Sequence, residues 1–95
     1  MNPYSVKKLP IDIEQGIAQK HRELRRKMGY SQEELSNRSG VSLGSLKRFE
    51  RTGQISLKNL LKLAHVLDRL NDFENLFSRP KDMDEIEQLF SDKTR

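Results

Sequence analysis

Apolar residues recur every three or four positions along most of the chain, which is the spacing of one face of an α-helix. Glycine and serine interrupt this pattern at intervals, as they do at the ends of helices. We therefore predict an all-α fold. The predicted helices cover residues 12–28, 32–38, 43–51, 57–70 and 71–77.

Three of the predicted helices begin after a serine that can cap a helix N-terminus. Ser31 is followed three residues later by Glu34, the pattern of a capping box in which each side chain binds a backbone N–H near the helix start. Ser42 and Ser56 have similar flanking residues. Gly40 lies between the first two caps, where a helix end needs a residue that adopts a left-handed backbone. This stretch predicts two short helices joined by a tight turn.

Helical spacing also predicts which side chains face the core. The expected inward set is Ile13, Ile17, Leu24 and Met28 in the first helix, then Leu35, Val41, Leu46 and Phe49, and finally Leu57, Leu60, Leu61, Ala64 and Leu67. A further apolar group either completes this core or forms an interface with another chain, and it consists of Leu63, Val66, Leu70, Phe73, Leu76 and Phe77.

Length and composition fit one small domain, since the chain has 95 residues of which 34% are hydrophobic. We expect a loose arm at 1–11, in which prolines break any early helix, a folded domain at 12–79 and an acidic tail at 80–95. There is no apolar run long enough to span a membrane and no secretory signal, and cysteine is absent. These features suggest a cytoplasmic protein without disulfides.

Charge is distributed unevenly along the chain. The net charge is +4, but residues 71–95 carry seven acids and four bases, so the first seventy residues carry +7. Two interpretations remain open: the basic body meets a polyanion, or the surface is simply solvated. Within the tail, residues 82–90 have the apolar spacing of a short amphipathic helix, which is either disordered or folded on a partner.

Candidate catalytic chemistry is sparse. His21 falls at near-helical spacing in the first helix, and a partly buried, hydrogen-bonded histidine is the expected role because His65 is the only other histidine. The sequence lacks a P-loop, a Gly-x-Ser-x-Gly motif and a His-Glu-x-x-His motif. We therefore expect no enzyme activity, no cofactor and no metal site.

The helix at 43–51 has one apolar side and one polar, basic side. Leu46 and Phe49 point inward, which leaves the remaining positions facing out. A basic surface helix of this kind is suited to the major groove of double-stranded DNA, which is wide enough to admit one helix. The candidate DNA-facing residues are Ser42, Leu43, Gly44, Ser45, Lys47, Arg48 and Arg51.

At these positions the chain resembles the Xre family of helix-turn-helix regulators, which includes the lambdoid phage repressors. The resemblance extends over roughly 13–77 and implies a five-helix, lambda-repressor-like domain. It also implies a bacterial or phage-type protein associated with the nucleoid. The matching residues are Ser31, Gln32, Glu34, Leu35, Gly40, Val41, Ser42, Leu46, Phe49 and Glu50.

The resemblance also implies roles for individual residues. Gln32 would contact a DNA phosphate and brace the recognition helix, and Arg25 would form a structural salt bridge with Glu50. Arg51 and Lys58 would contact the DNA backbone. The DNA-binding set is then Gln32, Ser42, Leu43, Gly44, Ser45, Lys47, Arg48, Arg51 and Lys58. Helices four and five often form a homodimer contact in this family.

Three features depart from the family pattern. The first recognition-helix positions are Leu43 and Gly44, so base readout would depend on Lys47, Arg48 and DNA shape. His21 replaces an aliphatic residue in the first helix, which puts local packing in question. The segment 50–57 is one residue shorter than is common.

Two functions are compatible with this sequence. One is a homodimeric repressor that binds an inverted DNA repeat. The alternative is an interaction protein, such as a HipB-type antitoxin, whose tail or dimer surface binds a toxin kinase and whose DNA binding is secondary. Steep salt dependence of DNA affinity would favour the first.

Overall fold

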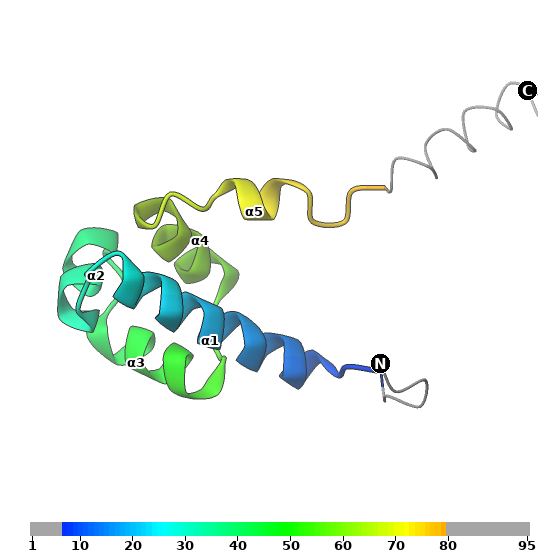
Figure 1. Ribbon diagram of the computed structural model, residues 1–95, viewed down its shortest axis with the longest axis horizontal. Helices are drawn as coiled ribbons and strands as arrows, with labels where there is room; N and C mark the ends of the chain where they lie inside the picture. Colours follow the sequence, from blue (N-terminus) through cyan, green and yellow to red (C-terminus); the bar gives the residue numbers. More distant parts are fainter. Residues whose placement is uncertain (1–6, 80–95) are drawn as a thin grey trace, which may run out of the picture.

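The computed structural model describes residues 7–79 and places five helices there, with no strand in that range. The helices are α1 (Pro10–Lys27), α2 (Gln32–Ser39), α3 (Leu43–Thr52), α4 (Leu57–Val66) and α5 (Asn71–Glu74). In Figure 1, α2 and α3 pack at one end of the long α1, and α4 leads into the short α5. Contacts join α1 to α3, α2 to α3 and α2 to α4. The prediction of an all-helical fold is confirmed.

Three serine caps begin helices as predicted. The hydroxyl of Ser31 accepts the backbone N–H of Glu34 at 3.0 Å, and Ser42 and Ser56 make the equivalent bond at 3.1 Å. Each bond satisfies a backbone donor that has no partner within its helix. The carboxylate of Glu34 pairs instead with Arg38 at 3.2 Å, so the capping box is made only from the serine side.

The turn between α2 and α3 also follows the prediction. Gly40 ends α2 with a φ of 79°, and its N–H bonds to the carbonyl of Ser36. The hydroxyl of Ser36 in turn donates to the carbonyl of Val41 at 2.6 Å. The turn thus takes three residues, 40–42, and α3 packs against α2.

The core lies between α1, α2, α3 and α4. The four side chains predicted to point inward around the turn are all buried, with exposed fractions of 0–1%. They pack with apolar residues from α1 and α4. The buried cluster comprises Ala18, Leu35, Val41, Leu46, Phe49, Leu63 and Leu67.

The first helix differs from the prediction at its start and in its buried face. It begins at Pro10, two residues before the predicted start at 12, because proline needs no N–H partner in the first turn and Asp12 accepts the N–H of Leu9 at 2.8 Å. The predicted residues Ile13, Ile17 and Met28 are exposed. The face packed on α3 is instead Ala18, His21 and Arg25. The first turns of α1 extend beyond the core.

The predicted fourth helix is too long. It ends at Val66, because Leu67 caps it and Asp68 has a left-handed φ of 58°. The N–H of Arg69 then bonds to the carbonyl of Ala64 at 2.8 Å and closes the turn. Leu57, predicted to be buried, is 62% exposed.

The fifth helix is shorter than predicted. It covers Asn71–Glu74, with Leu70 at its N-cap. Phe77 has a left-handed φ of 61° and is fully exposed, and Leu76 is 56% exposed. Residues 1–6 of the predicted arm and 80–95 of the predicted tail lie outside the described residues, and so does the amphipathic pattern at 82–90.

Candidate nucleic-acid interface

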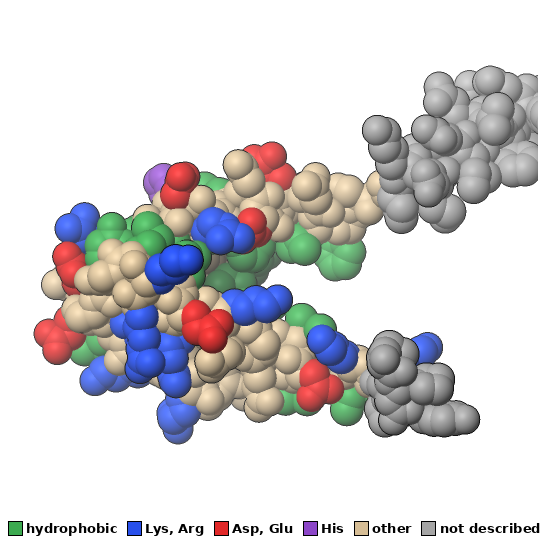
Figure 2. Space-filling model, viewed as in Figure 1, with side chains coloured by type: hydrophobic (Ala, Val, Ile, Leu, Met, Phe, Trp, Pro, Cys, Tyr) green, Lys and Arg blue, Asp and Glu red, His purple; other side chains and the backbone are tan. Residues whose placement is uncertain are grey.

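The third helix has a buried side and a basic, solvent-facing side. Leu46, Phe49 and Glu50 are buried, at the three- and four-residue spacing of one helix face. On the other side Lys47, Arg48 and Arg51 are exposed, and so are Ser42 and Gly44. Figure 2 shows lysine and arginine side chains gathered over the region of α3. This helix therefore presents cations to solvent while its opposite face is anchored.

The first turn of α3 carries little side-chain bulk. Gly44 has no side chain, and a Cβ atom there would meet no other atom within 4 Å. Leu43 is half-buried, and the hydroxyl of Ser42 donates to that of Ser45 at 2.8 Å. A DNA backbone or base edge could approach the helix axis closely at this end.

Arg48 is oriented by the loop that follows α3. Its guanidinium donates to the side-chain carbonyl of Gln54 at 2.6 Å. Beside this contact is a shallow hollow of about 270 Å³, lined by residues of α3, the loop and the start of α4. Lys58 is exposed on the first turn of α4. Arg48 is the cation that lines this hollow, together with the polar side chains of Ser45, Gln54, Ser56 and Asn59.

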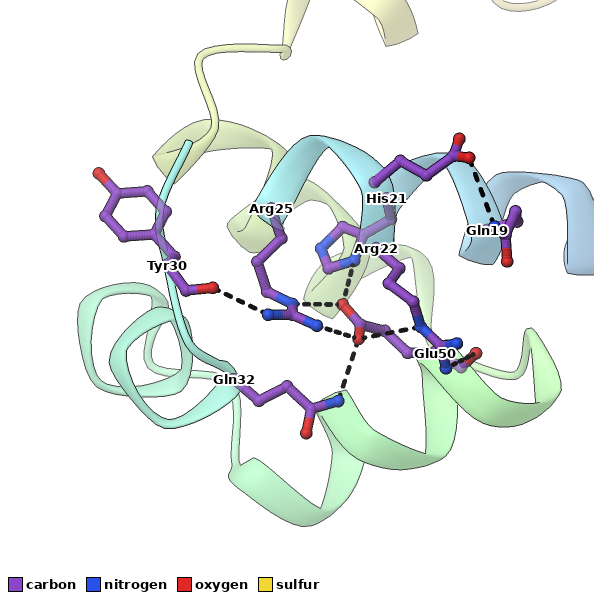
Figure 3. A network of polar contacts seen from close by, with 8 residues as sticks. Gln19, His21, Arg22, Arg25, Tyr30, Gln32 and Glu50 are labelled. Carbon is purple, nitrogen blue, oxygen red and sulfur yellow. Dashed lines mark hydrogen bonds and ion pairs between the residues drawn. The ribbon is translucent and has the colours of Figure 1, made fainter. Parts of the chain in front are cut away.

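The buried carboxylate of Glu50 joins α3 to α1 and α2. Arg25 donates to both of its oxygens at 2.8 Å, and Gln32 donates to one of them at 3.0 Å (Figure 3). Nδ1 of His21 lies 2.9 Å from the same carboxylate. An ionised carboxylate only accepts hydrogen bonds, so Nδ1 carries the proton and donates. We call Glu50, Arg25, His21 and Gln32 the Glu50 cluster.

The environment keeps Glu50 ionised. Burial alone would raise its pKa, but hydrogen bonds from His21, Arg25 and Gln32, with the positive charge of Arg25, together lower the pKa to about 2. Arg22 adds a partly exposed contact, since its side chain donates to the Glu50 backbone carbonyl at 3.2 Å. The carboxylate is therefore ionised at neutral pH.

The predicted site residues fall into two groups. Gln32 points to Glu50, at the junction of α2 with α3, and Arg25 forms the bidentate ion pair that the resemblance implied. The other predicted residues lie on α3, its N-cap or the first turn of α4, and they are Ser42, Leu43, Gly44, Ser45, Lys47, Arg48, Arg51 and Lys58.

Sequence reasoning missed two contributors. His21 was expected to be hydrogen-bonded, but its partner was not foreseen, although it precedes Arg25 by four residues and so shares its helix face. Gln54 was not considered at all, because it lies in a loop with no periodic pattern. Only the four-residue spacing in α1 could have indicated the first of these.

Other kinds of site are not evident within residues 7–79. That range contains no group of three or more His, Asp or Glu side chains that could bind a metal ion. None of its helices combines the length and apolar character that crossing a bilayer requires.

Comparison with protein families gives one match. Residues 22–73, more than half of the chain, match the helix-turn-helix family model. Comparison with curated proteins and with solved structures found no match. The matched region contains α2, the turn, α3 and α4, together with the part of α1 that carries Arg25. The chain therefore belongs to the Xre-like helix-turn-helix family of DNA-binding regulators.

Proposed function

We propose that this protein is a transcriptional repressor that binds an inverted DNA repeat as a homodimer, with α3 in the major groove of each half-site. One observation carries the proposal. The exposed cations of α3 project from a helix whose buried face is tied to α1 and α2 through Glu50. A surface that must fit a groove benefits from such rigidity, because little side-chain or backbone freedom is lost on binding.

Direct readout of bases is assigned to Lys47 and Arg48. Both types of side chain can donate to O6 and N7 of guanine in the major groove. Leu43 offers an apolar contact to a thymine methyl group, and Gly44 lets the helix approach without reading a base. Specificity would then depend on few direct contacts plus DNA shape.

Backbone contacts are assigned to three further residues. Arg51 and Lys58 are exposed on either side of the loop that joins α3 to α4. Gln32 begins α2, and its amide group could meet a phosphate while it braces Glu50. These contacts would set the register of α3 along the groove and contribute most of the salt dependence.

The homodimer contact is assigned to the apolar surface around α5. Leu70 is 39% exposed and Phe77 is fully exposed, and an apolar pair of this kind is expected to be covered in an assembly. A two-fold dimer presents two α3 helices to half-sites about one helical turn apart. Sedimentation of Phe77→Asp tests the assignment, since the variant should be monomeric at concentrations where the parent is dimeric.

The DNA-binding proposal is tested by selecting bound sequences from random DNA and footprinting the best of them. Lys47→Ala and Arg48→Ala should each weaken specific binding by roughly 5- to 150-fold, which corresponds to about 1–3 kcal/mol per base contact. Lys20→Ala is the matched control, because Lys20 is an exposed lysine on α1 that lies beside residues of α4 and α5 and not on α3. An unenriched selection at low salt, or equal losses in all three variants, would refute the proposal.

A further inference from the structure

A second hollow lies on the other side of the domain from α3. It is an open groove of about 450 Å³ between α1, α4 and α5. Its walls are mostly apolar and include Ile17, Leu24, Leu60, Leu67, Phe73 and Leu76. Figure 2 shows this hollow open to solvent, with hydrophobic side chains along its α5 side. We call it the α1–α5 groove.

The groove leaves apolar side chains exposed to solvent. Ile17 and Leu76 line it and are 39% and 56% exposed, so apolar surface is left in contact with water. His21 also lines it, and Nε2 of His21 is buried without a hydrogen-bond partner in the described part of the chain. Buried polar atoms are normally paired. The exposed apolar side chains are the observation that calls for an occupant, and it should be apolar on the side that faces the groove, because the buried Nε2 is not reached from solvent.

We propose that the C-terminal segment of the same polypeptide, residues 82–90, docks in the α1–α5 groove. Its sequence provides apolar side chains at intervals of three and four, which would place them on one side of a helix. The apolar side could cover the groove. A helix of this length is too short to be stable alone in water. The apolar residues are Met83, Ile86, Leu89 and Phe90.

Charge complementarity supports this occupant. Residues 82–92 contain five acids and no lysine or arginine. The groove is bordered by Lys20 on α1 and by Arg69 after α4, and Arg69 pairs with Asp72 at 2.9 Å. With the apolar side of the segment in the groove, its acidic side would lie near these cations, where opposite charges attract weakly but favourably.

The connection is long enough for docking within one chain. Leu76 lines the groove, and Met83 follows it by seven residues. Seven residues in extended form span at most about 25 Å. This length allows the chain to leave α5, turn and return along the groove. A short tether also makes the effective concentration of the segment high, so the intramolecular arrangement is favoured over capture by a second copy.

A single tryptophan provides the test, because the chain has no tryptophan of its own. In full-length Phe90→Trp, docking predicts blue-shifted emission and acrylamide quenching severalfold below that of free tryptophan. Adding Ile17→Glu, on the groove wall, should restore the emission and quenching of an exposed tryptophan. The matched control is Leu57→Glu, which places the same charge on an exposed apolar residue outside the groove and should leave the signal unchanged.

A second measurement leaves the body of the domain unaltered. The double variant Ile86→Asp with Leu89→Asp should uncover the groove, so a hydrophobic dye should bind it more than it binds the parent at equal helix content. Three results would overturn the proposal: solvent-exposed emission in Phe90→Trp, an equal response to Ile17→Glu and Leu57→Glu, or protection that disappears on dilution. The last result would place the segment on a second copy. None of these readouts depends on DNA, so the repressor proposal can fail while this one stands.

Discussion

Replacing Glu50 with glutamine tests whether the Glu50 cluster fixes α3 on the body of the domain. The substitution keeps the shape of the side chain but removes its negative charge. Arg25, which is only 6% exposed, would keep its positive charge without a counterion. The glutamine amide would accept hydrogen bonds only through its oxygen, because its NH2 group is a donor. His21, Arg25 and Gln32 would then lack one of the two acceptor atoms that the carboxylate provides. A buried charge left unpaired is costly in a low-dielectric interior.

The expected loss follows from the pKa of Glu50. The pKa falls from 4.5 to about 2 in the folded state, which corresponds to about 3 kcal/mol of stabilisation of the folded protein when the carboxylate is ionised. Breaking one partner of a buried ion pair typically costs about 3–5 kcal/mol, which agrees. A domain of this size has a total stability of roughly 4–10 kcal/mol, so Glu50→Gln should be close to unfolding.

The pH dependence gives an independent check with a definite sign. Because the folded-state pKa lies below the unfolded value of 4.5, this stabilisation is fully present above pH 4.5. It is lost progressively as the pH falls towards 2, where the folded carboxylate becomes protonated. The parent should therefore lose about 3 kcal/mol more than Glu50→Gln over this interval.

Urea denaturation followed by circular dichroism, at neutral pH and at several points down to acid, measures both effects. Glu14→Gln is the matched control, since Glu14 is an exposed glutamate on α1, and its cost should stay within about 0.5 kcal/mol. A loss of less than about 1 kcal/mol in Glu50→Gln would refute the reasoning. The reasoning would also be refuted if the free energy of unfolding fell equally with decreasing pH in the parent and in Glu50→Gln.

Four further substitutions test local features by thermal or urea denaturation. Gly53→Ala should destabilise the domain by about 1–3 kcal/mol, because Gly53 has a φ of 85° and a Cβ atom would lie 2.9 Å from the backbone of Glu14. The control is Gly44→Ala, where a Cβ atom on the helix meets no other atom within 4 Å. It should be neutral or stabilise the domain by up to about 1 kcal/mol. Ser42→Ala should cost about 1 kcal/mol through loss of the α3 cap, and a stability equal to that of the parent would contradict the capping role. Leu46→Ala, which empties a fully buried position, should cost about 2–5 kcal/mol.

The region from Tyr30 to Gly53 could be predicted from sequence because its signals are local. A serine cap determines where a helix begins, and a glycine with positive φ determines where it ends. Three-residue spacing then places Leu46 and Phe49 on one face and leaves the cations on the other. These rules involve residues a few positions apart, so no knowledge of the rest of the fold is needed.

The predictions failed where packing between distant elements decides the outcome. In α1 the apolar stripe through Ile13 and Ile17 extends past the core, so the helix buries Ala18 and two polar residues instead. At the end of α4 the apolar pattern continues, but the left-handed turn at Asp68 stops the helix. The α1–α5 groove, which lies between these elements and α5, has no signature in the sequence.

His21 illustrates how a departure from the family pattern can be accommodated in a core. Its ring packs edge-on against Phe49, with centroids 5.0 Å apart, so it fills the apolar space expected of an aliphatic residue. The same ring donates to Glu50, the residue that follows Phe49 in α3. One side chain of α1 thus packs against α3 and also bonds to it. Because Lys47, Arg48 and Arg51 project from the opposite side of α3, the contacts of His21 and Arg25 determine where those cations are presented.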